Sequence, residues 1–192
     1  YDSTSISSHS ECLSQVRHGK NKDGDRLPQI NLLLLFGQKS NLPFYYRKLA
    51  GNIPDVKTLR VLMRDLNVLG YPKVKLVTDR GFYSMDNVNE LYQNHIKFLM
   101  SANTSLSFVK KTIDTVKDTM CDWSNYNDKY DLYTYTQTIE WDYTQVRPYK
   151  GDTLKGRRRM YFHLYYNADK AVEDGRKFNL RMSALSEELL SG

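Results

Sequence analysis

The chain has 192 residues, of which 40% are hydrophobic and 26% are charged, so it can build a folded core and is not disordered as a whole. Its longest apolar run, residues 32–36, is far shorter than the roughly 20 residues that cross a bilayer. The net charge of +6 favours binding to nucleic acid without sequence preference, although many proteins with no such partner are equally basic.

The two cysteines, Cys12 and Cys121, show no metal-ligand spacing and build no disulfide framework. Reduced thiols in a cytoplasmic protein are the simplest interpretation.

Three strands are expected first. The hydroxyl and β-branched residues of 1–7 favour an extended strand. Residues 29–37 form a continuous apolar run, which is typical of a strand covered on both faces. Residues 42–49 are rich in β-formers and follow after a short turn, so these two segments predict a hairpin.

A helix comes next, with apolar residues at helical spacing between residues 56 and 69. Asp55 is its expected N-cap and Gly70 its expected C-terminal stop. A strand at 73–79, a helix capped by Ser84 and a strand at 96–102 follow. This order predicts an α/β fold with a mixed sheet flanked by helices, as in a ribonuclease-H-like core.

The pattern changes after residue 102. Residues 106–120 have helical spacing, and nine of the fifteen tyrosines lie between residues 126 and 166. Aromatic and polar residues alternate there, which predicts strands with one aromatic face. We therefore expect three parts. Residues 1–102 form the first part of the core, residues 103–166 form a helix plus tyrosine-rich β insertion, and residues 167–192 form a C-terminal helix that leads back to the core.

Two aspartates carry the functional prediction. Asp2 lies in the first strand and Asp79 ends the fourth, and these strands are neighbours in a ribonuclease-H-like sheet. Two adjacent carboxylates repel each other unless a cation lies between them. Mg²⁺ suits such a site, and a pair of such ions can assist phosphodiester chemistry. From the residues alone, however, a loop or capping role is the more common use of an aspartate such as Asp79.

Four segments resemble successive blocks of bacterial insertion-sequence transposases with a DDE catalytic domain. The branch is the one whose third motif is Tyr-x2-Arg-x3-Glu-x6-Lys. The blocks are "DSTSISS", "PQINLLLLF", "LPFYYRKLAGNIPDVKTL" and "LVTDRGFYS", and the resemblance is close over residues 1–102.

The resemblance implies that Asp2 is the first catalytic, metal-binding acid and Asp79 the second, with Gly81 and Phe82 completing the second block. It implies metal-assisted DNA cleavage and strand transfer with two Mg²⁺ or Mn²⁺ ions. The implied partners are transposon ends and target DNA, with a homo-oligomer as the active complex in the bacterial cytoplasm.

The glutamate of the third motif, which would be the third catalytic acid, has no match in this sequence. No tyrosine is followed by arginine at three and glutamate at seven residues, and Glu173, Glu187 and Glu188 lack that frame. The glutamate therefore lies beyond Gly192 or has been lost, and the start at Tyr1, inside a strand, favours truncation. The fragment itself is expected to be inactive.

Two alternatives stay open for the activity: a ribonuclease-H-like nuclease without strand transfer, and a decayed copy that binds DNA without cutting it. The run "KGRRR" could follow a phosphate backbone, and it could equally be a solvated hairpin turn. Trp141 could stack on a flipped base, but a core position is favoured. The candidate DNA-contacting residues are Arg80, Lys155, Arg157, Arg158 and Arg159.

Overall fold

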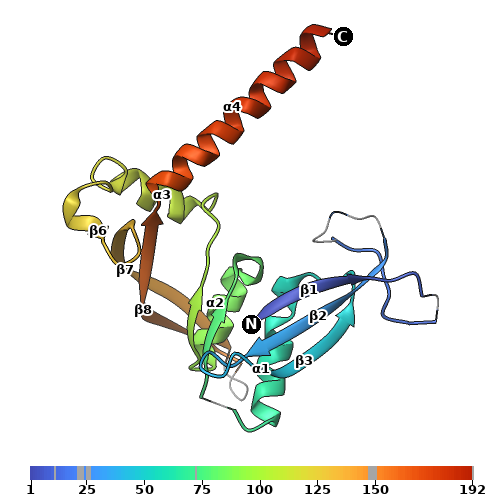
Figure 1. Cartoon of the computed structure of the whole chain (residues 1–192). Helices are drawn as coiled ribbons and strands as arrows, with labels where there is room; N and C mark the ends of the chain where they lie inside the picture. The colour runs from blue at the N-terminus through green and yellow to red at the C-terminus, as the bar shows by residue number, and fades with distance from the viewer. Residues whose placement is uncertain (11, 21–23, 25–26, 72, 147–150, 192) are drawn as a thin grey trace. The chain divides into compact units, whose positions relative to one another are not determined.

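The structure is a computed structural model that describes residues 1–10, 12–20, 24, 27–71, 73–146 and 151–191 (Figure 1). Its described part is mixed α/β, with four α-helices and three sheets. The chain divides into two compact units, Tyr1–Asn103 with Asp142–Gly156, and Thr104–Trp141 with Arg157–Gly192. Among the described helices, none combines the length and the hydropathy that crossing a bilayer requires.

The first unit begins with an antiparallel sheet of β1 (Asp2–Ser7), β2 (Gln29–Phe36) and β3 (Pro43–Ala50), in that order. The predicted hairpin is confirmed, because β2 pairs antiparallel with β3 from Ile30 to Phe36. Every second residue of β2 is buried, so the strand has one covered face and one half-exposed face. The expectation that both faces are covered is therefore wrong.

The first unit also contains a parallel pair of strands, β4 (Lys75–Thr78) and β5 (Lys97–Met100). Helices α1 (Leu59–Val68) and α2 (Met85–Gln93) precede and link them. The ladders keep this pair separate from β1–β2–β3, so the single ribonuclease-H-like sheet stays a prediction.

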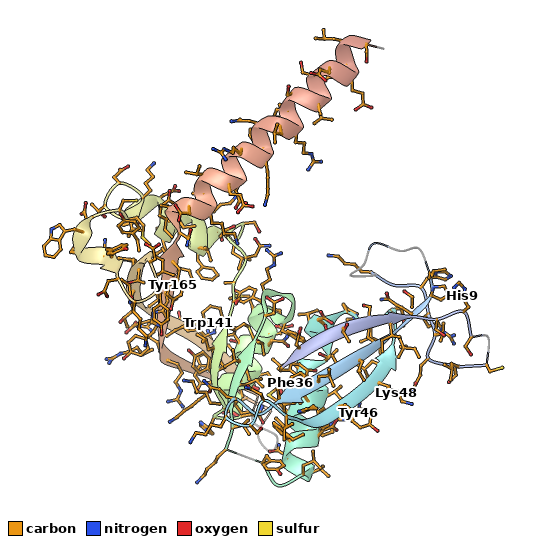
Figure 2. The ribbon with its side chains drawn as sticks, viewed as in Figure 1. His9, Phe36, Tyr46, Lys48, Trp141 and Tyr165 are labelled. Carbon is orange, nitrogen blue, oxygen red and sulfur yellow. The ribbon has the colours of Figure 1, made fainter. Side chains whose placement is uncertain are left out.

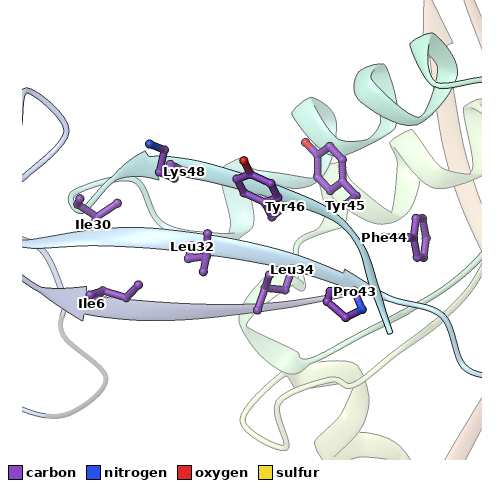
Figure 3. A pocket seen from close by; sticks show the side chains of 9 residues that line it. All are labelled: Ile6, Ile30, Leu32, Leu34, Pro43, Phe44, Tyr45, Tyr46 and Lys48. Atoms are coloured by element: carbon purple, nitrogen blue, oxygen red, sulfur yellow. The ribbon is translucent and has the colours of Figure 1, made fainter. Parts of the chain in front are cut away.

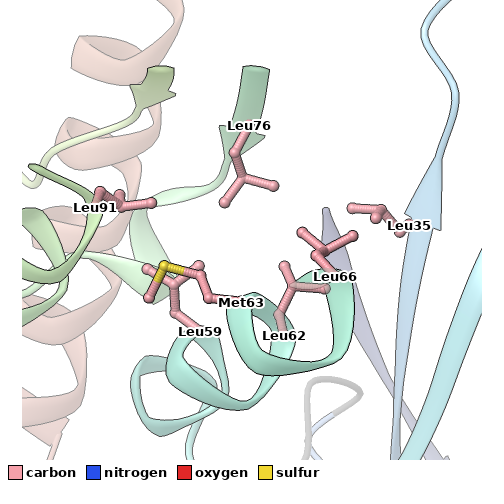
Figure 4. Close-up of a cluster of buried hydrophobic side chains, with 7 residues drawn as sticks. All are labelled: Leu35, Leu59, Leu62, Met63, Leu66, Leu76 and Leu91. Atoms are coloured by element: carbon pink, nitrogen blue, oxygen red, sulfur yellow. The ribbon is translucent and has the colours of Figure 1, made fainter. Parts of the chain in front are cut away.

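One apolar cluster joins both sheets to the helices (Figure 4). Leu35 from β2 and Leu76 from β4 pack in the same cluster as the buried side of α1. The opposite faces of the two sheets therefore both turn away from α1. Leu34 on β2 and Val77 on β4 lie on those faces, half-exposed and exposed respectively. The cluster consists of Leu35, Leu59, Leu62, Met63, Leu66, Leu76 and Leu91.

The helix ends agree with the sequence in two of three places. Ser84 caps α2 by accepting a hydrogen bond from the Asn87 amide at 3.0 Å. Gly70 follows α1 with a φ of 79°, the left-handed conformation of a helix stop. The prediction that Asp55 caps α1 is wrong. Asp55 begins the short 3₁₀ helix η1 (Asp55–Lys57) after Pro54, and Thr58 is the N-cap of α1.

A polar contact ties β3 to α1. The Tyr45 hydroxyl and the Arg47 guanidinium both donate to Oδ2 of Asp65. Burial works to raise the pKa of Asp65, but the hydrogen bonds from these two donors outweigh it and hold the pKa below its ordinary value. The charged carboxylate is therefore the form that this contact stabilises.

The second unit contains α3 (Ser107–Val116), the short η3 (Trp123–Asn125) and the main part of a three-stranded sheet. Its strands are β6 (Tyr126–Asn127), β7 (Leu132–Val146) and β8 (Thr153–Tyr166). The predicted alternation is confirmed on β7, where Trp141 (labelled in Figure 2) is buried, while the residues before and after it are exposed. Trp141 meets the Phe108 ring edge-on, which supports the core role.

The last element is α4 (Ala168–Ser191), the long helix expected from the sequence. It runs through Gly175 without a break.

Candidate active site

Asp2 lies at the start of β1, directly opposite Leu34 of β2. Residues opposite each other in a ladder point to the same face, so the Asp2 side chain is on the face that turns away from α1. The carboxylate is exposed, and its Oδ1 accepts the Ser3 amide at 2.7 Å. In the described part of the chain it has no ion pair, so Oδ2 is available to a further ligand.

Asp79 directly follows β4 and is the N-cap of the short 3₁₀ helix η2 (Arg80–Phe82). Its Oδ1 accepts the Arg80 amide at 2.5 Å. This is the capping role that an aspartate in a loop commonly plays. The side chain is exposed, and the second oxygen has no partner among the described residues. Capping fixes the direction of the carboxylate and leaves one oxygen for a ligand.

Tyr1 brings the start of β1 to the end of β4. Its main-chain nitrogen donates to the Val77 carbonyl at 3.0 Å. Its hydroxyl shares a hydrogen bond with the Thr58 hydroxyl at 3.0 Å, and its ring packs on that of Phe82 with 4.7 Å between centroids. Burial raises the pKa of the Tyr1 hydroxyl above its ordinary value, so the hydroxyl stays protonated at neutral pH.

The hydrogen bond between Tyr1 and Val77 also fixes where the two aspartates lie along the chain relative to each other. Asp2 is one residue after Tyr1, and Asp79 is two residues after Val77. A main-chain hydrogen bond holds two strands about 5 Å apart. The structure therefore places the chain segments that carry both aspartates side by side.

Buried contacts hold the turn after Asp79 in place. Phe82 is only 1% exposed, and its carbonyl accepts a hydrogen bond from the Asn87 side-chain amide at 2.7 Å. The same amide donates to the Val56 carbonyl at 2.8 Å. Gly81 lies against Asp55, where an added Cβ would be 3.3 Å from the carboxylate oxygen. The block predicted to support Asp79 therefore contains one core residue and one closely approached glycine.

The part of the chain that the structure describes places no third acidic ligand with them. The described residues contain no group of three or more histidine, cysteine, aspartate or glutamate side chains that could hold a metal ion. Glu173 forms a 2.6 Å salt bridge with Lys177 one turn along α4, while Glu187 and Glu188 are exposed on the same helix.

Both aspartates nevertheless offer the type of ligand that a hard divalent cation takes. Carboxylate oxygens are the ligands that Mg²⁺ prefers, and one or two of them suffice when waters and substrate phosphates supply the rest. Both carboxylates are solvent-exposed, so phosphate and water can reach them.

The candidate DNA-contacting residues are exposed, but four of them do not form a turn. Lys155, Arg157, Arg158 and Arg159 lie inside β8, which begins at Thr153, so the hairpin-turn interpretation is wrong. A glycine among charged residues, as in this segment, is a pattern typical of a turn. Gly156, however, is a strand residue whose missing side chain makes room for the Tyr143 ring.

Arg157 pairs with Glu140 of β7 at 3.0 Å. Arg80 is exposed in η2, directly after Asp79. Of the candidate DNA-contacting residues, it is the one adjacent to Asp79 in the sequence.

The face that carries Asp2 also holds an apolar hollow of about 600 Å³ (Figure 3). We call this surface the open face, defined by Ile6, Ile30, Leu32, Leu34 and Tyr46 of β1–β2–β3. Lys48 of β3 borders it. The apolar run of β2 predicts that each face of the strand is apolar, but the expectation that both faces are covered did not foresee this open surface.

The described geometry agrees with a comparison of the sequence with known families. A family model described as "Transposase DDE domain" matches residues 1–185. A search of curated proteins returned no match.

Proposed function

Since the chain belongs to the transposase DDE-domain family, we propose that Asp2 and Asp79 are the first two metal-binding acids of a DNA transposase. The contact between Tyr1 and Val77 carries this proposal, because it joins the two segments on which the aspartates lie. The family supports phosphoryl transfer on nucleic acid, and its members generally use divalent metal ions.

The substrate is DNA, and the reaction is hydrolysis at the transposon end followed by attack of the freed 3′-hydroxyl on target DNA. A bound Mg²⁺ or Mn²⁺ ion would supply positive charge to activate the attacking oxygen and stabilise the leaving one. The Asp2 and Asp79 carboxylates would hold the ion, each with one oxygen fixed by a neighbouring amide. Arg80 attracts the phosphate, and the buried Phe82 keeps the turn rigid.

The metal site is tested by titrating the chain with Mn²⁺ and measuring heat or the signal of free Mn²⁺. We expect weak binding that Asp2→Asn and Asp79→Asn each reduce. Asp114→Asn is the matched control, because Asp114 is an exposed aspartate on α3. Equal affinity in all four proteins would contradict the assignment.

Catalysis is tested separately, with a nicking and joining assay on duplex DNA. We expect no cleavage from residues 1–192, since they lack a glutamate in the frame of the third motif. A parent chain that includes this motif should nick and join DNA in a metal-dependent way, and Asp79→Asn should abolish both steps. Nicking without joining would favour the nuclease instead. Robust cleavage by residues 1–192 would show that another carboxylate, such as Glu173, completes the site.

A further inference from the structure

Two lysines are register partners in the parallel strand pair of the first unit. Lys75 is the first residue of β4 and Lys97 is the first residue of β5, and the ladder between the strands sets them opposite each other. Neighbouring strands lie about 5 Å apart, and register partners point to the same face. The ladder therefore holds the stems of two ammonium groups side by side.

The burial pattern shows which face of the pair carries the lysines. Lys75 and Lys97 are both exposed. Val77 and Leu99, two residues further along each strand, are 50% and 52% exposed, whereas Leu76 belongs to the cluster around α1. Both lysines thus lie on the face of β4 and β5 that turns away from α1, as Val77 does.

The charge of this lysine pair is not neutralised within the described part of the chain. The ion pairs of the described residues involve neither Lys75 nor Lys97. Like charges held opposite each other on one face weaken a sheet. A phosphate group turns this repulsion into attraction, because its oxygens accept charge-assisted hydrogen bonds from both ammonium groups. The pair is therefore arranged to take an anion.

The lysine pair and Asp79 lie at opposite ends of β4. Asp79 follows the last strand residue with an extended backbone and is four residues after Lys75. Four extended residues span about 13 Å. A DNA strand carries one phosphate per about 3.4 Å of helix axis, so this distance corresponds to about four nucleotides.

We propose that Lys75 and Lys97 are a phosphate-binding pair, which holds the DNA backbone about four nucleotides from the phosphate that reacts at the aspartates. The proposal rests on the proposed function, because DNA is the ligand that carries phosphates at this spacing. The pair directs the bound strand along β4, away from Asp79. It contacts no base, so it holds DNA without sequence preference.

DNA binding is measured by fluorescence anisotropy of a labelled duplex, in EDTA and over a series of NaCl concentrations. Each phosphate contact adds about 0.9 to the slope of log affinity against log salt, so Lys75→Gln with Lys97→Gln should lower the slope by about 2. The affinity at low salt should fall about tenfold. Lys110→Gln with Lys111→Gln is the matched control, because it removes the same charge from exposed positions of α3 and should change the slope by less than half as much.

The repulsion between the two lysines gives a second readout, without DNA. Lys97→Gln alone should raise the urea midpoint seen by circular dichroism at low salt, since it removes a like charge opposite Lys75. The gain should shrink in about 1 M NaCl, because salt screens the repulsion. A midpoint that falls at low salt would overturn the proposal, since the lysine would then have a stabilising partner.

Equal effects of the two double variants on the salt slope would also overturn the proposal, because net charge alone would then explain binding. Sodium phosphate should displace the duplex no better than NaCl of the same ionic strength. Stronger displacement from the wild type than from the Lys75→Gln, Lys97→Gln variant would assign the pair to free phosphate and overturn the DNA assignment.

The metal site is separated from the lysine pair by titration with Mn²⁺ alone. The Lys75→Gln, Lys97→Gln variant should bind Mn²⁺ as the wild type does, whereas Asp79→Asn should keep the salt slope of the wild type in EDTA. An unchanged Mn²⁺ affinity in Asp79→Asn would contradict the proposed metal site and leave the lysine pair in place. A wild-type chain that binds no duplex at low salt would overturn both proposals.

Discussion

Replacement of Phe82 by alanine should destabilise the first unit by about 3–5 kcal/mol. Truncating a fully buried aromatic residue loses its transfer free energy and leaves a cavity. Phe82 is almost completely buried, and part of the loss comes from its contact with the Tyr1 ring. Since domains of ordinary stability unfold with about 5–15 kcal/mol, the variant should lose a large part of the total.

Two optical signals separate the units in a urea titration. Trp123 and Trp141 both belong to the second unit, so tryptophan fluorescence reports on that unit, while far-ultraviolet circular dichroism reports on both. With a urea dependence of about 1–3 kcal/mol per molar, the Phe82→Ala midpoint seen by circular dichroism should fall by at least about 1 M. The midpoint seen by fluorescence should move less.

Phe44→Ala provides the control, since Phe44 belongs to the same unit but is 50% exposed. The free energy of unfolding of this variant should fall by only about 1 kcal/mol, because Phe44 buries less area than Phe82. Equal circular-dichroism midpoints for Phe82→Ala and Phe44→Ala would refute the inference that Phe82 anchors the turn after Asp79.

Three further changes test local contacts. The lowered pKa of Asp65 means that its stabilising contribution is present above about pH 4, the pKa of an unfolded aspartate, and is lost as the pH falls below it. Asp65→Asn removes the charge that Arg47 contacts, so urea midpoints at pH 7 and pH 3 should differ less than in the wild type. Ser84→Ala should cost about 1 kcal/mol in the same titration through loss of the α2 cap, and no change would contradict that role. Gly156→Ala places a Cβ 2.6 Å from the Tyr143 ring and should cost about 1–3 kcal/mol, whereas an unchanged midpoint would mean that the ring moves aside freely.

Most elements could be predicted because their periodicity is strong and uninterrupted. The hairpin of β2 and β3 and the helix that Ser84 caps follow directly from the order of apolar and turn residues. The sequence does not show which residue caps α1, because both Asp55 and Thr58 can cap a helix. The short η1 between Pro54 and Thr58 has no strong sequence signal.

The candidate site was predictable only in part. A carboxylate directly after a strand, as at Asp79, can be read from the sequence. The contacts that hold it cannot, because Tyr1 meets Thr58, Val77 and Phe82 across 57 to 81 residues of chain, and such contacts have no periodic signature. The role of the aspartates in metal binding stays a prediction.

The open face affects how the thermal stability of this protein is best measured. Environment-sensitive dyes fluoresce when they bind apolar surface, and the native sheet already offers Leu32, Leu34 and Tyr46 to them around its hollow. A dye-based melting curve should therefore start from a bright baseline, and its rise on heating should be small. Intrinsic fluorescence or calorimetry avoids this background, because neither depends on a dye that the folded molecule binds.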